Sequence, residues 1–217
     1  LKELGTSRHP LGHLLVEKTL REGGFRGGIS SDKAVLDRYS TDESIFSIRP
    51  QVVIQPKDPK DVERAVALLA KETKRFPSLS LTPRSLTDSV VVDIATHMHR
   101  IDEPIKKKGE VTITVEPGAM WRNVEKRLKT EGVYLPSYPA SKDICTIGGA
   151  VSNNSAGPDS LRFGHTANYV ASLNVVLYDG NTYTIAPMDY SEWKARSKKT
   201  DAYASILAQV VNLVEKN

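Results

Sequence analysis

The sequence has little cysteine and no long apolar run. Cys145 is the only cysteine among 217 residues, so no internal disulfide can form and we expect a reducing compartment such as the cytoplasm. No apolar stretch approaches the roughly 20 residues needed to cross a bilayer, which predicts no transmembrane segment. Residues Leu1–Gly5 lack the charged-then-apolar layout of a secretory signal. These absences predict a cytoplasmic protein and leave peripheral membrane association open.

Common nucleotide-binding signatures are also missing. No G-x-G-x-x-G follows a strand pattern and no G-x-x-x-x-G-K-[ST] loop occurs, which excludes the motif-bearing Rossmann and P-loop classes. The net charge of +4 suits an anionic small ligand and gives little support to a nucleic-acid partner. Residues Gly24–Gly28 resemble one RNA-binding glycine–arginine repeat, although a single copy is more typical of a loop. A nucleic-acid or protein-binding module without redox activity is therefore one alternative.

Three segments in the first half predict a small parallel unit. Residues 51–55 form a β-branched strand, and residues 79–82 form a second one. Between them, Asp58 as N-cap and Pro59 in the first turn begin a helix whose apolar side chains recur at helical spacing. The two strands of such a β-α-β unit run parallel.

The remaining segments predict an N-terminal arm and a second lobe. The arm covers residues 1–45 and the main domain residues 46–217. Asp179-Gly180-Asn181 is typical of a hairpin turn. The predicted fold class is α+β with two lobes, one a small parallel β-α-β lobe and the other larger and mostly antiparallel. The further expected elements are short helices at 13–20 and 35–39, strands at 89–94, 111–115, 173–178 and 182–185, and helices from Trp121 to Gly132 and over 202–214.

The stretch Thr146–Gly157 carries the strongest functional signal. It combines glycine, small apolar and amide-bearing residues, with a strand-like segment before it and a hairpin after it. Glycine lets a backbone approach a flat or anionic ligand closely, and Thr, Ser and Asn supply short hydrogen-bonding groups. The pattern predicts a large cofactor lying against main chain. The alternative is a Gly/Ala-rich turn packed under a helix.

Taken in order, these segments resemble the PCMH-type FAD-binding domain of the vanillyl-alcohol oxidase/p-cresol methylhydroxylase superfamily. The branch that is most similar contains the glycolate oxidase and D-lactate dehydrogenase flavoproteins. The resemblance covers residues 39–187 and implies FAD held without covalent attachment between two lobes. It rests on Tyr39–Ser44, Pro50–Pro56 with Asp58–Val62, Thr82-Pro83-Arg84, Val115–Gly118, Leu135-Pro136 with Pro139, Thr146–Gly157, and Phe163-Gly164 through Tyr169-Val170 to Asp179-Gly180.

The resemblance also implies where the cofactor lies. Main chain at Ile147–Gly149 would pass the flavin and ribityl chain, Pro139–Ser141 would lie along the diphosphate, and Pro117-Gly118 would lie near the adenosine. The cofactor-binding residues that the resemblance implies are Pro83, Arg84, Pro117, Gly118, Pro139, Ala140, Ser141, Thr146, Ile147, Gly148, Gly149, Asn153, Asn154, Ser155, Gly157 and Gly164.

Two departures from the family pattern stand out. Members follow the Pro-Arg of the second strand with a glycine-rich phosphate loop, whereas Arg84 here runs directly into Ser85. We expect that a segment is omitted between them and that their backbones lie too far apart for one peptide bond. The sequence also stops at Asn217, before the family's substrate domain, so no catalytic acid or base is assigned.

The resemblance implies a flavin-dependent oxidoreductase that oxidises a 2-hydroxy acid such as D-lactate or glycolate by hydride transfer to FAD. Alternatives on the same fold are a reductase of the UDP-N-acetylenolpyruvoylglucosamine type and the flavin subunit of a larger oxidase. The electron acceptor stays unassigned, and homo-oligomerisation stays open. No metal site is expected, because the histidine pairs lack carboxylates or cysteines at ligand spacing.

Overall fold

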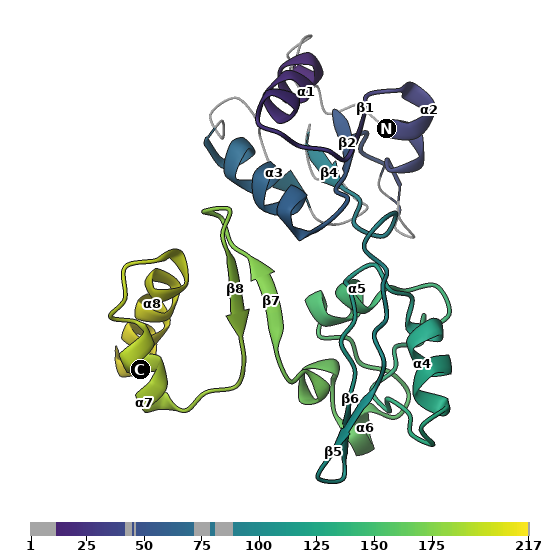
Figure 1. Cartoon of the computed structure of the whole chain (residues 1–217), viewed down its shortest axis with the longest axis vertical. Coiled ribbons are helices and arrows are strands. Elements are labelled where there is room, and N and C mark those ends of the chain that lie inside the picture. Colours follow the sequence, from purple (N-terminus) through teal and green to yellow (C-terminus); the bar gives the residue numbers. More distant parts are fainter. Residues whose placement is uncertain (1–11, 42–44, 46, 72–78, 81–88, 217) are drawn as a thin grey trace.

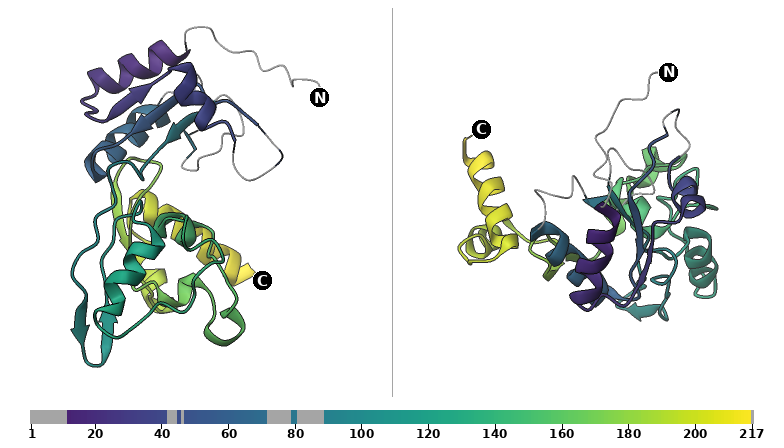
Figure 2. Two further views of the ribbon diagram at one scale, coloured as in Figure 1. Left: turned by 90° about the vertical axis from the view of Figure 1, so that its right-hand side faces the viewer. Right: turned by 90° about the horizontal axis from the view of Figure 1, so that it is seen from above.

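A computed structural model describes residues 12–41, 45, 47–71, 79–80 and 89–216. An N-terminal lobe and a second lobe follow one another along the long axis, and the last hairpin and helices lie beside them (Figures 1 and 2). The elements are α1 Gly12–Glu22, β1 Gly28–Ser30, α2 Lys33–Arg38, β2 Val52–Gln55, α3 Pro59–Lys71, β3 Leu79–Ser80, β4 Val90–Val92, β5 Ile105–Lys107, β6 Glu110–Thr112, α4 Trp121–Lys129, α5 Ile147–Ser152, α6 Ser160–Phe163, η1 Thr166–Tyr169, β7 Leu173–Val176, β8 Thr182–Ile185, α7 Tyr190–Arg196 and α8 Ala202–Lys216.

The N-terminal lobe is built on a mixed sheet with strand order β1-β2-β4-β3. Both β2 and β3 run parallel to β4, which lies between them, with Val52 and Leu79 each opposite Val90. The predicted parallel β-α-β unit is therefore confirmed. The Val and Ile side chains of β2 and β4 are almost completely buried, as expected for parallel strands that are covered on both faces.

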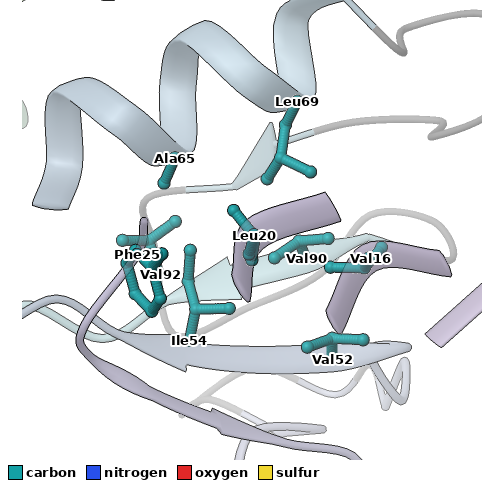
Figure 3. Close-up of a cluster of buried hydrophobic side chains, with 9 residues drawn as sticks. All are labelled: Val16, Leu20, Phe25, Val52, Ile54, Ala65, Leu69, Val90 and Val92. Atoms are coloured by element: carbon teal, nitrogen blue, oxygen red, sulfur yellow. The ribbon is translucent and has the colours of Figure 1, made fainter. Parts of the chain in front are cut away.

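Helix α3 begins where the sequence predicts and covers one face of this sheet. Pro59 starts the helix, and the Asp58 carboxylate accepts a hydrogen bond from the amide of Asp61 at 3.0 Å. Ala65 and Leu69 lie four residues apart on the face that packs against the strands (Figure 3). The helix is therefore held by its apolar stripe, with the capping residues fixing where it begins.

Within the expected N-terminal arm, the described residues 12–41 pack into this lobe. Val16 and Leu20 of α1 join the same buried cluster as α3 (Figure 3). Leu36 of α2 packs on the other side of the sheet with Val53 and Val91. Strand β1 pairs antiparallel with β2. These contacts complete the covering of both sheet faces and place β1 at one sheet edge.

In the second lobe, α4 packs against the β5–β6 hairpin. Val124 and Leu128 are buried in a cluster with side chains of the hairpin and the loops around it. The chain turns after α4 at Gly132, which has a φ of +71° and so meets the predicted stop. Lys108 and Gly109, with φ of 50° and 86°, form the turn between β5 and β6. Two consecutive left-handed residues give a two-residue hairpin loop the twist of its strands.

The predicted hairpin of β7 and β8 connects the end of the chain to the N-terminal lobe. Gly180 in its turn has a φ of +78°, and a Cβ there would lie 2.4 Å from the Cβ of Ala67 in α3. Thr182 donates a hydrogen bond to Glu63 of α3 at 2.5 Å. The turn thus packs directly on α3, while the antiparallel helices α7 and α8 pack on each other farther out (Figure 1).

Candidate functional site

Helix α5 occupies the glycine-rich stretch that sequence analysis singled out. Thr146 is its N-cap, and the Thr146 hydroxyl accepts a hydrogen bond from the amide of Gly149 at 3.2 Å. Ala150 is buried and anchors the helix to the lobe. The expectation of a strand-like segment before this run is wrong. Residues 136–145 form turns, because their prolines cannot donate to a strand ladder, and only an isolated bridge joins Met120 to Thr146.

The first turn of α5 rests on a loop from an earlier part of the chain. The amide of Ile147 donates to the carbonyl of Ala119 at 2.8 Å, and that of Gly148 to the carbonyl of Pro117 at 2.8 Å. A Cβ on Gly148 would lie 2.7 Å from the Cβ of Pro117. Gly149, by contrast, is exposed, and a Cβ there would meet only the capping hydroxyl, at 3.2 Å. Gly148 is therefore required by packing within the protein, and Gly149 is the one open to a ligand.

The turn that follows β4 contacts the loop 117–119. Gly118 is buried and donates its amide to the carbonyl of Met98 at 2.7 Å. A Cβ on Gly118 would lie 2.6 Å from the Cα of Ala95 and 2.7 Å from the carbonyl oxygen of Ile94. No side chain fits there, so the loop and the turn after β4 are pressed together at their main chains.

The segment that the resemblance places along a diphosphate lies next to the end of this stretch. A Cβ on Gly157 would lie 1.8 Å from the carbonyl oxygen of Tyr138, so these two main chains touch. Pro139 is buried, whereas Ala140 and Ser141 are exposed. The amides of Ala140 and Ser141 donate to no acceptor among the described residues. Exposed free amides of this kind suit an anionic ligand.

Asn154, Ser155 and Gly164 join α5 to the following turn. Asn154 has a φ of 44°, and its side-chain oxygen accepts the amide of Ala167 at 2.9 Å. The carbonyl of Ser155 accepts both the amide and the hydroxyl of Thr166, at 3.1 and 2.8 Å. Gly164 has a φ of 79°. The oxygen of Asn154, expected to reach the cofactor, is thus engaged in the fold, while Asn153 stays exposed.

The charged side chains around the 139–145 segment are of both signs. Lys142 lies over the ring of Tyr138 at 4.5 Å and pairs with Glu125 at 3.2 Å. Arg122 donates to the carbonyl of Asp143 at 2.7 Å and makes no ion pair with a described residue. Burial raises the pKa of the Cys145 thiol, so this cysteine stays neutral. Arg122 thus adds a positive charge beside this segment, where the exposed Asp143 adds a negative one.

The structure brings most of the predicted site residues into one connected unit. The loop Pro117-Gly118, the segment 139–141, helix α5 and the turn at Gly164 contact one another directly or through one intermediate residue. Pro83 and Arg84, together with the predicted break after Arg84, lie outside the described residues. Sequence reasoning missed the carbonyls of Ala119 and Tyr138, since no local pattern marks a main-chain carbonyl as a support.

Other features of the described residues lie away from this unit. A groove of about 620 Å³ lies between the β7–β8 turn and the start of α8, lined by Tyr178, Asp179, Lys199 and Asp201 among others. Within the described ranges, no group of three or more His, Cys, Asp or Glu side chains could hold a metal ion. None of the helices in these ranges is both long and apolar enough to cross a membrane.

Comparison with known proteins shows which proteins the chain is similar to. The family described as FAD binding domain matches residues 50–186. Among curated relatives, D-2-hydroxyglutarate dehydrogenase of Pseudomonas putida is 33% identical over 181 residues, 79% of this chain and 18% of that protein. Glycolate oxidase subunit GlcD of Bacillus subtilis is 30% identical over 146 residues, 63% of this chain and 30% of that protein. The chain thus spans less than a third of these relatives.

Solved structures show the same fold. Alkyldihydroxyacetonephosphate synthase superposes with a TM-score of 0.64 at 20% identity, covering 81% of this chain and 37% of that one. Xylooligosaccharide oxidase from Myceliophthora thermophila superposes with a TM-score of 0.64 at 16% identity, covering 82% of this chain and 38% of that one. The predicted two-lobed α+β fold is therefore confirmed, and the family match favours a flavin site over a binding module without redox activity.

Proposed function

Because the chain belongs to the FAD binding domain family, we propose that it is the FAD-binding part of a flavin-dependent oxidoreductase that oxidises a 2-hydroxy acid. The observation that carries this proposal is a pair of relatives that are identical to the chain at 33% and 30% of the aligned residues. Both are named for acting on a 2-hydroxy acid, D-2-hydroxyglutarate in one case and glycolate in the other. D-2-Hydroxyglutarate is therefore the first substrate to test, with D-lactate and glycolate next.

Residues of this chain fit the cofactor at the exposed side of the α5 unit. Gly149 offers main chain without a Cβ, Asn153 an exposed amide side chain, and Ala140 and Ser141 unpaired amide donors for phosphate oxygens. The positive charge of Arg122 adds to the attraction for a diphosphate. When bound, FAD supplies the acceptor for the hydrogen and electron pair that leave the substrate's α-carbon. In this proposal the chain binds and orients the cofactor and covers one face of it against water.

A spectroscopic experiment on the full-length protein tests this proposal. Purified protein should be yellow, with flavin absorbance that is released by acid precipitation, because attachment is proposed to be non-covalent. Under anaerobic conditions, D-2-hydroxyglutarate, D-lactate or glycolate should bleach that absorbance, whereas L-lactate should not. Protein without flavin that also fails to take up added FAD would refute the proposal. Bound flavin that none of the three acids bleaches would refute the substrate class alone.

Location and assembly form part of the same proposal. The single cysteine supports a cytoplasmic protein. The electron acceptor is to be sought by reoxidising the bleached flavin with candidate acceptors. Light scattering on the purified protein measures whether it forms a homo-oligomer.

A further inference from the structure

A carboxylate in the N-terminal lobe gathers hydrogen bonds from three separate segments. The Asp93 side chain follows β4 and accepts the hydroxyl of Tyr39 at 2.8 Å and the amide of Gln55 at 3.1 Å. It also caps its own turn, accepting the main-chain amides of Ala95 at 2.9 Å and Thr96 at 3.2 Å. The Thr96 hydroxyl completes the set. Tyr39 is the C-cap of α2 and Gln55 is the last residue of β2, so the carboxylate ties both to the turn after β4.

The charge state of this cluster is fixed across the ordinary pH range. Burial alone would raise the pKa of Asp93, but hydrogen bonds from Thr96, Tyr39 and Gln55 outweigh it and lower that pKa. Burial and the hydrogen bond to Asp93 raise the pKa of Tyr39 to about 12. A charged acceptor therefore faces a neutral phenol donor, which is a strong type of hydrogen bond.

The turn that Asp93 caps is in direct contact with the support of α5. The amide of Met98 donates to the carbonyl of Ile94 at 3.1 Å, which closes the turn. The carbonyl of Met98 in turn accepts the amide of Gly118, and no Cβ fits between the turn and that glycine. The residues on either side of Gly118 supply the carbonyls that hold the first two amides of α5. Three successive steps of main-chain hydrogen bonds, the last made by two bonds side by side, thus lead from the turn capped by the carboxylate to the helix.

We propose that Asp93, held by Tyr39, is a positioning residue for the flavin site, acting through the turn 94–98 and the loop 117–119 on the N-terminus of α5. The inference rests on the proposed function, because α5 is the wall against which FAD is placed. Interiors transmit displacement since they are closely packed. A turn that loses its cap moves the loop, and the loop moves the open main chain at Gly149. Neither Tyr39 nor Asp93 needs to touch the cofactor.

Four variants of the full-length protein test this inference. Asp93→Ala removes every bond of the carboxylate, Asp93→Asn keeps the capping oxygen, and Tyr39→Phe removes one hydrogen bond. Tyr183→Phe is the matched control, because the Tyr183 hydroxyl also donates to a carboxylate, at 2.6 Å, but in the β7–β8 hairpin. For each variant, the measurements are the dissociation constant for added FAD, the circular dichroism of the bound flavin, and deuterium uptake of the apoprotein over residues 144–152.

We expect Tyr39→Phe to weaken FAD binding about tenfold, since it removes one hydrogen bond to a charged acceptor. Asp93→Ala should weaken binding more, and Asp93→Asn should recover part of the loss. Deuterium uptake at α5 should rise in the same order, and the flavin spectrum should change. Tyr183→Phe should leave all three within twofold of the parent. If Asp93→Ala does not fold, the comparison of Tyr39→Phe with Tyr183→Phe still tests the positioning role.

The outcomes separate this inference from the proposed function. A parent protein that binds no FAD refutes both. A parent that binds FAD, with Tyr39→Phe equal to Tyr183→Phe in affinity, spectrum and deuterium uptake, refutes only the positioning role. Equal losses of thermal stability in these two variants, without a difference at α5, would likewise assign Tyr39 a purely structural role.

Discussion

Two neighbouring glycines in α5 provide a test of how this helix packs on the loop 117–119. Alanine at either position gains helix propensity, worth about 0.5–1 kcal/mol over glycine. At Gly148, however, the new Cβ would lie 2.7 Å from the Cβ and 2.8 Å from the carbonyl oxygen of Pro117. At Gly149 it would meet only the Thr146 hydroxyl, at 3.2 Å. The same substitution one residue apart therefore isolates the contact with the supporting loop.

The magnitude follows from these distances. A carbon placed 2.7 Å from another carbon is about 1 Å too close, and overpacking of this kind costs roughly 1–3 kcal/mol. Because the propensity gain is common to both variants, Gly148→Ala should be less stable than Gly149→Ala by about 1–3 kcal/mol. Gly149→Ala should be as stable as the parent or slightly more stable.

Urea unfolding of the apoprotein, followed by far-UV circular dichroism, measures this difference, and titration with FAD supplies a second readout. Gly149→Ala should weaken FAD binding although it does not destabilise the fold, because a methyl group then stands on the open main chain. Free energies of unfolding that agree within about 0.5 kcal/mol for the two variants would refute the packing argument. Unchanged FAD affinity in Gly149→Ala would refute the placement of the cofactor.

Three further predictions concern the rest of the fold. Asp61→Ala should lower the free energy of unfolding by about 3 kcal/mol in urea titrations, since the buried carboxylate accepts two main-chain amides and two arginine side chains, and an unpaired buried donor costs roughly 1–3 kcal/mol. Gly180→Ala should lower the melting temperature more than Gly109→Ala, because both glycines have positive φ but only the first also meets α3. The contribution of Asp93 to the free energy of unfolding should be complete above its ordinary pKa of 3.8 and be lost as pH falls through its lower folded pKa. The contribution of Tyr39 should instead be lost as pH rises from 10 to about 12. Urea titrations at each pH would measure both.

Local signals predicted the elements of the fold well. Asp58-Pro59 marks the beginning of α3, and Asp179-Gly180 marks the turn between β7 and β8. These features depend on the conformational preferences of one or two residues, and the sequence displays such preferences directly. The order of the segments that resemble the family then predicted the two-lobed fold, which the comparisons confirm.

Contacts between distant segments could not be predicted in the same way. Gly118, Gly148 and Gly157 look like residues that admit a ligand, but each is pressed against main chain from elsewhere in the protein. The oxygen of Asn154 looks available to a cofactor and instead caps the turn at Ala167. Glycine and asparagine have the same local preference in both roles, so only the folded arrangement separates them.

The pairing of β1 with β2 has a practical consequence for work on this domain. β2 carries the apolar run Val52–Ile54, and β1 covers one side of it by forming a short antiparallel edge strand. A recombinant fragment that began at residue 46 would leave the backbone groups of β2 unpaired along that side. An uncovered apolar edge is a template for intermolecular pairing. Fragments for expression should therefore retain residues 28–30, and shorter ones are expected to aggregate.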